Sequence, residues 1–202
     1  MIRILSLAGL PKSVTDQIKP IVDTCRACRD WFRPAATNMS TLRMSTKFNE
    51  YVQCDLLFVG DLVILHMIDE ATRFSAGCLL MTTEIGKPRE TATILYAIYY
   101  SWIAVHGAPK HLIADQEGAL ESDEARLFCD RNQIQRLPKP VGSKAAIVER
   151  HHEIIRQTVR RIRTQAHYEN LNVPDKYIVA EAIFAHNAMT NVGGFTPYIA
   201  VY

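Results

Sequence analysis

Residues 48–68 read FNEYVQCDLLFVGDLVILHMI, and this stretch decides the predicted fold. Residues 48–59 are rich in β-branched, aromatic and aliphatic side chains, which favours a strand. Residues 62–68 are almost continuously apolar, as expected of a central strand covered on both faces. Gly60 and Asp61 between the two stretches supply a tight turn. We therefore expect two antiparallel strands at the start of the folded core.

Beyond this hairpin, the pattern changes to alternating helices and strands. A third strand is expected at residues 74–81, joined to the second by a short link. The later elements are expected as a helix from about 88 to 107, a strand at 110–114, a helix opening at Ser122, a strand at 134–137, a long helix at about 145–167, a helix at about 174–190 and a tail, FTPYIAVY. This order predicts a mixed α/β sandwich with one layered core.

The composition limits the class of protein. The chain has 202 residues, of which 48% are hydrophobic and 22% charged, values that exclude disordered, collagen-like and disulfide-scaffold classes. No apolar run approaches the roughly 18 residues needed to span a bilayer, and residues 2–10 make no convincing secretory signal. Five scattered cysteines suggest a reducing compartment. Residues 1–47 are expected to be a lead-in, and residues 48–202 the core.

The net charge of +2 hides an asymmetry along the chain. Residues 1–50 carry a net +4, residues 51–130 a net −7 and residues 131–202 a net +5. Within residues 136–163, eight basic side chains accompany only Glu149 and Glu153. An acidic middle beside a basic segment fits a metal-holding site next to a phosphate-binding surface, and it equally fits a solvated surface.

Three acidic residues stand where a catalytic site would need them. Asp55 lies inside an otherwise apolar strand, where a buried carboxylate needs a partner, a proton or a metal. Asp115 follows the fourth strand, at the kind of position where α/β sheets bind ligands. Glu149 opens the long helix. If the first and fourth strands are neighbours, the three carboxylates could converge as oxygen ligands for Mg²⁺ or Mn²⁺. Each also has an ordinary structural interpretation, as a paired, turn or first-turn acid.

The long helix presents a charged stripe. At about 100° per residue, Arg156, Arg160 and Arg163 fall within about 40° of Glu149, and His152 lies at about −60°. The opposite side holds the apolar face, with His151 on it, so we expect His151 to pack in the core. The charged stripe would hold a metal at its start and phosphates along its length, or would simply be solvated.

With these residues, the chain resembles the catalytic core of a retroviral or LTR-retrotransposon integrase, the DDE class of the ribonuclease H-like fold. Asp55 matches the first acid of that pattern, Asp115 in HLIADQEGAL the second and Glu149 in KAAIVERHHEIIRQTVRRI the third. The second and third acids are 34 positions apart, close to the usual interval. The similarity covers residues 48–202, and GGFTPYIAVY resembles the end of such cores.

The resemblance implies a three-layer fold around a mixed five-stranded sheet and a polynucleotidyl transferase that processes 3′ ends and joins DNA strands. Asp55, Asp115 and Glu149 would hold two Mg²⁺ or Mn²⁺ ions. DNA backbone contacts would come from a set of basic side chains: Lys144, Arg156, Arg160, Arg163 and His152. The implied partners are element-end and target DNA and further copies of the chain, with no membrane. Residence in the nucleus follows from the DNA substrate.

The lead-in carries a smaller match. Cys25 and Cys28 resemble the second half of the HHCC zinc module that precedes integrase cores, but the chain has no histidine before His66. A structural zinc site needs four ligands, so Zn²⁺ would bind only if the missing histidines were supplied, and we expect a reduced pair of thiols. The chain is expected to be a piece of a larger polyprotein or a fragmentary gene copy.

Two alternatives remain open from the sequence. The chain could be a catalytically silent or domesticated fragment that binds nucleic acid. It could also be another ribonuclease H-like nuclease, a class that usually carries a fourth acid, for which Asp61, Asp69 and Glu117 are candidates. Asp69 also competes with Asp55 for the role of first acid, because it ends the second predicted strand.

Overall fold

The computed structural model describes residues 11–24, 45–80, 90–114, 119–138 and 147–202. The chain divides into two compact units, Met1–Ser40 and Thr41–Tyr202. In the first unit, helix α2 (Lys12–Thr24) contains Pro20. The sequence analysis did not predict this helix. Cys25 and Cys28 lie outside the described residues, and the division between lead-in and core at residues 47 and 48 stays a prediction.

The second unit is built on a five-stranded mixed sheet, as predicted. The strands are β1 (Tyr51–Val59), β2 (Leu62–Asp69), β3 (Ser75–Leu79), β4 (His111–Ala114) and β5 (Gln135–Pro138). Their order in space is β3-β2-β1-β4-β5. The first three strands form the expected antiparallel meander, whereas β4 runs parallel to both β1 and β5. The first and fourth strands are therefore neighbours.

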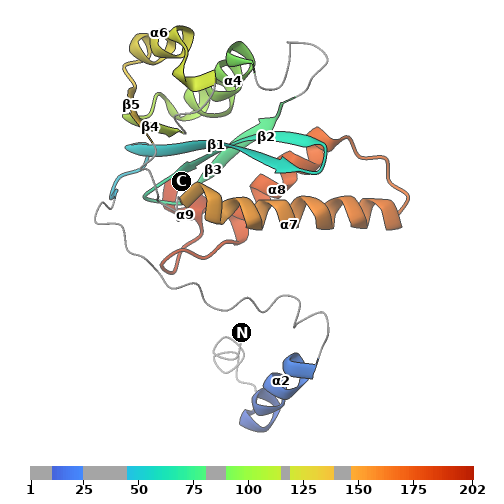
Figure 1. The fold of residues 1–202 in the computed structure, drawn as a ribbon. Helices are drawn as coiled ribbons and strands as arrows, with labels where there is room; N and C mark the ends of the chain where they lie inside the picture. Colours follow the sequence, from blue (N-terminus) through green and yellow to red (C-terminus); the bar gives the residue numbers. More distant parts are fainter. Residues whose placement is uncertain (1–10, 25–44, 81–89, 115–118, 139–146) are drawn as a thin grey trace. The chain divides into compact units, whose positions relative to one another are not determined.

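Helices cover both faces of this sheet (Figure 1). The segments are α4 (Thr91–Ile98), a π-helical turn η1 (Tyr99–Ile103), α5 (Ala104–His106), a 3-10 turn η2 (Ala119–Glu121), α6 (Asp123–Arg131), α7 (Ile147–Tyr168), α8 (Asp175–Met189) and α9 (Pro197–Val201). Helices α4 and α6 lie on one face, and α7 and α8 on the other. No helix in the described part of the chain is long and apolar enough to cross a membrane.

Successive residues of β1 point to opposite faces, and this alternation divides the core in two. Val52 and Cys54 pack with the residues of α4, η1 and α6. Leu57 and Val59 pack with Ile155 and other residues of α7 and α8. The odd-numbered positions of β1 thus face α7, and this parity decides which side chains can take part in a site with that helix.

Local signals in the sequence explain several helix starts. Ser122 caps α6 by accepting a hydrogen bond from the Ala125 amide at 3.2 Å, with two acids in the first turn, as predicted. The C-terminal tail ends in α9, a short helix that the sequence analysis did not predict. Its signals were present, because Thr196 caps the helix and Pro197 occupies the first turn.

Candidate functional site

Asp55 lies in the middle of β1 on the face that carries α7. It shares that face with Gln53 and Leu57, two positions before and after it. Its carboxylate Oδ1 accepts a hydrogen bond from the Leu56 amide at 2.8 Å. Asp55 is half-buried, which corrects the expectation of a fully buried carboxylate. Part of the Asp55 residue is therefore exposed at the surface of the strand.

Glu149 lies in the first turn of α7 and is exposed. The start of this helix is attached to the strand that carries Asp55, because the Val148 amide donates a hydrogen bond to Gln53 Oε1 at 3.0 Å. Val148 also packs against Ile68 of β2, the residue paired with Gln53 across the strands. Asp55 lies two positions from Gln53 on β1 and Glu149 directly follows Val148 on α7, so this attachment joins the two segments that carry the acids.

A second contact joins the sheet to α7. His66 of β2 pairs with Asp55 in register and is completely buried. Its Nε2 lies 3.0 Å from Ser75 Oγ. The His66 ring also contacts the ring of His152, one turn after Glu149, at a centroid distance of 5.1 Å. The start of α7 is thus joined to the sheet by a polar attachment at Gln53 and by the packed rings of His66 and His152.

His66, His151 and His186 are uncharged at neutral pH. Burial lowers the pKa of His66 well below its ordinary value, and the neighbouring His152, His186 and His151 lower it further. Burial, then His186 and nearby arginines, lower the pKa of His151 to about 3, and burial also lowers that of His186. His151 Nδ1 and His186 Nε2 lie 2.6 Å apart. His151 is a packed core residue, as predicted, and the cluster adds no positive charge beside Asp55.

Asp115 lies outside the described residues. Strand β4, which ends at the preceding Ala114, runs parallel to β1 with Ile113 opposite Gln53. The described part of the sheet therefore has the parallel neighbours that the sequence-based prediction of converging acids requires. Lys144 and Glu117 also lie outside the described residues.

The other acids considered from the sequence have structural roles. Asp69 is fully buried, and its carboxylate accepts four hydrogen bonds from Asn49, Ala71 and Thr72. These bonds hold the turn after β2, so Asp69 does not compete with Asp55 as a metal ligand. Asp61 lies 3.3 Å from Arg163 Nη1. Both carboxylates are engaged by these contacts.

The basic side chains predicted to contact DNA differ in their surroundings. Arg156 is half-buried, with Nη1 at 2.6 Å from Glu153 and Nε at 3.4 Å from the Phe58 carbonyl. Arg163 bridges Asp175 at 2.8 Å and Asp61. Arg160 is exposed, and no described residue forms an ion pair or hydrogen bond with it. Of these three arginines, Arg160 is the one whose guanidinium is not already engaged by a carboxylate.

His152, which was predicted to contact DNA, lies on the buried face of α7. His152 is only 7% exposed and packs against His66 beneath the helix. The buried residues Val148, His152, Ile155 and Val159 lie between about −120° and −60° from Glu149 around the helix axis. The sequence analysis placed the apolar face about a quarter turn away. Histidines supply part of the buried face, and a pattern based on aliphatic side chains alone misses them.

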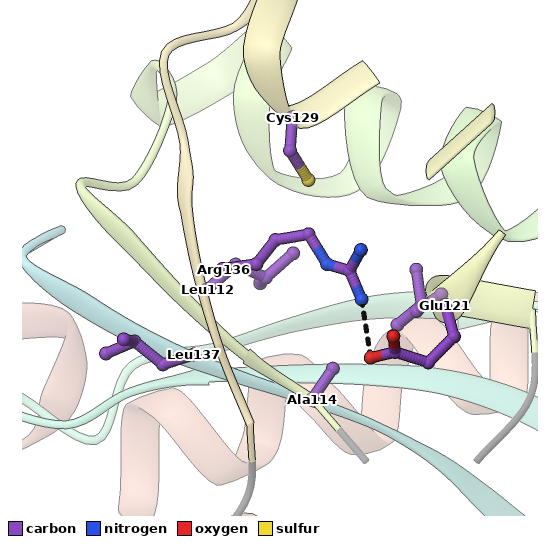
Figure 2. A pocket seen from close by; sticks show the side chains of 7 residues that line it. Leu112, Ala114, Glu121, Cys129, Arg136 and Leu137 are labelled. Atoms are coloured by element: carbon purple, nitrogen blue, oxygen red, sulfur yellow. Dashed lines mark hydrogen bonds and ion pairs between the residues drawn. The ribbon is translucent and has the colours of Figure 1, made fainter. Parts of the chain in front are cut away.

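A separate cavity of about 270 Å³ opens beside the ends of β4 and β5. Figure 2 shows its apolar wall, which includes Leu112 and Leu137, and the ion pair of 2.7 Å between Arg136 and Glu121 that crosses it. Arg136 belongs to the basic segment noted in the sequence, but a carboxylate already neutralises it. This cavity contains neither Asp55 nor Glu149, so it is distinct from the candidate site.

The donor set fits a hard divalent cation. Asp55 and Glu149 offer carboxylate oxygens, the ligands that Mg²⁺ and Mn²⁺ prefer, on two surfaces that the Gln53–Val148 bond holds together. Among the described residues, no three His, Cys, Asp or Glu side chains form a group that could hold a metal. A metal site that includes Asp55 and Glu149 would therefore need a further donor from outside the described ranges.

The sequence analysis missed Gln53, Glu70 and His66. Gln53 and Glu70 are each 7% exposed and share a hydrogen bond of 2.8 Å. A signal for Gln53 was available, because it is the polar residue two positions before Asp55 in an apolar strand. Nothing in the sequence indicated Glu70, whose role depends on the pairing of β1 with β2.

Solved structures share this fold. The HTLV-2 integrase catalytic core domain in complex with magnesium, in its trimeric form, superposes with a TM-score of 0.61 and 18% identity over 75% of this chain and 95% of that one. A chain of the simian T-cell lymphotropic virus intasome in complex with PP2A regulatory subunit B56 gamma gives a TM-score of 0.67 and 16% identity over 98% and 72%. The BIV integrase catalytic core gives 0.60 and 15% over 75% and 93%.

These similarities establish the fold: the second unit has the ribonuclease H-like architecture of a retroviral integrase catalytic core. The resemblance inferred from the sequence is confirmed at this level. No family model matches the chain, and no curated protein matches it. The HTLV-2 core has been solved in both trimeric and dimeric forms.

Proposed function

We propose that this chain is the core of a retroelement integrase, a polynucleotidyl transferase that trims 3′ ends and joins them to target DNA. The observation that carries the proposal is the attachment of the Glu149 helix to the Asp55 strand through Gln53 and Val148. It joins the segments that carry two of the three acids of the integrase pattern, within the matching fold. A DNA substrate also implies residence in the nucleus.

In this proposal, Asp55, Asp115 and Glu149 hold two Mg²⁺ or Mn²⁺ ions. When bound, such ions polarise a phosphodiester and lower the pKa of the attacking water or 3′-hydroxyl. The chain's own residues orient the carboxylates, and Arg160 and Lys144 bind the DNA backbone. No covalent link between enzyme and DNA is needed. Zinc binding by Cys25 and Cys28 stays a prediction that requires histidines from elsewhere.

The proposal includes self-association of the chain. A shallow hollow of about 340 Å³ lies between β3, α8 and the C-terminal residues. Its apolar rim includes Val105, Phe184 and Tyr202, which are 65%, 56% and 70% exposed. Exposed apolar side chains gathered around one hollow are typical of a protein contact surface, so we assign this face to a second copy of the chain.

The first test is disintegration of a branched DNA substrate by the full chain with Mg²⁺ or Mn²⁺, wild type beside Asp55→Asn. We expect metal-dependent product from the wild type and at least about a 100-fold loss in the variant, because several kcal/mol of transition-state stabilisation depend on the ligands. A folded wild type that binds DNA but yields no product would indicate the catalytically silent alternative. Unchanged product from Asp55→Asn would contradict the assignment of Asp55.

Arg160 gives a separate test of DNA binding. Arg160→Ala is expected to weaken affinity for any DNA sequence and to reduce the slope of log K against log salt by about 0.9, the contribution of one phosphate contact. Arg163→Ala is the matched control, because its guanidinium already bridges Asp61 and Asp175; it should leave the slope unchanged. Fluorescence anisotropy between about 50 and 200 mM salt measures both. Equal slopes for wild type and Arg160→Ala would exclude Arg160 as a phosphate ligand.

A further inference from the structure

Gln53 is a buried amide between the strand that carries Asp55 and the helix that carries Glu149. Its Oε1 accepts a hydrogen bond from the Val148 amide at 3.0 Å, and its Nε2 donates one to Glu70 Oε1 at 2.8 Å. The side chains of Gln53 and Glu70 are both only 7% exposed. The chain Glu70–Gln53–Val148 therefore runs from the end of β2 through β1 into the first turn of α7.

The orientation of the Gln53 amide follows from its two partners. A backbone N–H only donates, so the Gln53 atom facing Val148 must be the oxygen. The nitrogen of the same amide then faces Glu70 and donates to its Oε1. Rotating the amide by 180° would break both bonds. Glu70 thus holds the Gln53 carbonyl toward the start of α7.

The hydrogen bond from Val148 to Gln53 satisfies a backbone N–H that has no acceptor within the helix. The first N–H groups of an α-helix have no partner within the helix, and here an amide from a neighbouring strand supplies one. Gln53 does this without adding a negative charge, although it lies two positions from Asp55 on the same face of β1. A glutamate at position 53 would place another carboxylate beside Asp55 and Glu149.

We propose that Gln53 is a positioning residue that holds Glu149 in register with Asp55, and that Glu70 orients Gln53 for this purpose. The inference rests on the proposed function, because it assigns Glu149 to the catalytic site. The rest of α7 is held independently by the packing of Ile155 and Val159 under the sheet. Loss of the Gln53 bond should therefore release the first helical turn while the helix remains docked.

The experiment compares three variants of the full chain with the wild type: Gln53→Ala, Gln53→Glu and the exchange variant that combines Gln53→Glu with Glu70→Gln. Gln53→Ala is expected to reduce the rate of metal-dependent joining about 10- to 100-fold, since a displacement of about 1 Å can cost 10²-fold. Its DNA affinity should stay within about twofold. Gln157→Ala is the matched control, because Gln157 lies on the same helix and bonds to Glu153 at 2.9 Å; it should leave the rate unchanged.

Gln53→Glu should also reduce the rate, because two carboxylates then face each other at positions 53 and 70. In the exchange variant, the glutamine introduced at position 70 can donate to the carboxylate introduced at position 53. That carboxylate still accepts from the Val148 amide, so we expect the exchange variant to recover most of the rate lost in Gln53→Glu. Failure to recover while the variant unfolds at the wild-type temperature would overturn the assignment of Glu70.

A second readout does not depend on activity. Amide hydrogen exchange at Val148 should be at least about tenfold faster in Gln53→Ala, with exchange at Ile155 and Val159 unchanged. Equal exchange at Val148 in the two proteins would overturn the inference, as would a wild-type joining rate in folded Gln53→Ala. If the wild type shows no metal-dependent product, the proposed function fails by itself, and the exchange measurement still decides whether Gln53 holds the helix.

Discussion

Glu149→Gln is expected to reduce Mg²⁺-dependent joining by at least about 100-fold while leaving the fold and the DNA affinity intact. Glu149 is exposed at the start of α7, so the neutral amide replaces it without packing cost. The substitution removes the negative charge that a divalent ion requires while keeping the shape of the side chain. A loss of several kcal/mol of transition-state stabilisation corresponds to this change in rate.

The matched control is Glu153→Gln, one turn further along the same helix. Glu153 is half-buried and binds Arg156 at 2.6 Å, so its substitution disturbs an ion pair of the helix but not the candidate site. Its joining rate should remain within about threefold of the wild type. Single-turnover rates and anisotropy titrations on the same preparations measure the two effects. Equal losses in both variants would mean that Glu149 acts only as a surface charge of α7.

Acidification is expected to unfold the second unit, because three buried histidines resist protonation. The pKa values of His66, His151 and His186 all lie below the ordinary value of 6.5 in the folded chain. Below about pH 6.5, the unfolded chain binds protons that the folded chain does not. Stability is therefore fully present above this pH and is lost as pH falls from 6.5 toward the folded pKa, about 3 for His151.

Between pH 7 and pH 5.5, the free energy of unfolding should fall by roughly 1 kcal/mol from His151 alone, and His66 and His186 should lower it further. The contact of 2.6 Å between His151 Nδ1 and His186 Nε2 explains part of the resistance. The pair shares one proton there, and a second would set two N–H donors against each other. Arg73 and Arg150 near His151 oppose its charging as well.

Urea unfolding followed by circular dichroism at both pH values measures this change. In His186→Gln, the difference between the two pH values should shrink, whatever the stability at pH 7. His167→Gln, which removes an exposed histidine from the last turn of α7, should retain the full difference. The same pH dependence in His186→Gln and the wild type would show that the His186 proton is not linked to unfolding.

Much of this fold is predictable from local pattern. Residues 48–68 predicted the β1–β2 hairpin because strand propensity and a Gly-Asp turn are both local properties. The starts of α6 and α7 agree with the predicted positions within about two residues. The two errors, α2 in the lead-in and α9 at the C-terminus, concern short segments in regions assigned to irregular chain.

The candidate site could also be predicted only in part. The sequence alone singled out Asp55 and Glu149, because an acid in an apolar strand and an acid at a helix start are visible without any partner. The parallel pairing of β1 with β4 had to be assumed, since it joins segments about 60 residues apart. Gln53 was visible in the sequence only as a polar residue in an apolar strand. Its role could not be predicted, because both of its partners, Glu70 and Val148, are distant in the chain.

The sequence by itself determined the order of strands and helices, the positions of the acids and the charged character of α7. Only the tertiary structure decided how α7 is rotated against the sheet, and therefore that His152 is buried while Arg160 is exposed. It also decided that Arg163 forms ion pairs with Asp61 and Asp175. The physical reason is that helical periodicity sets the spacing of residues around an axis, whereas contacts with the sheet select the face that is buried.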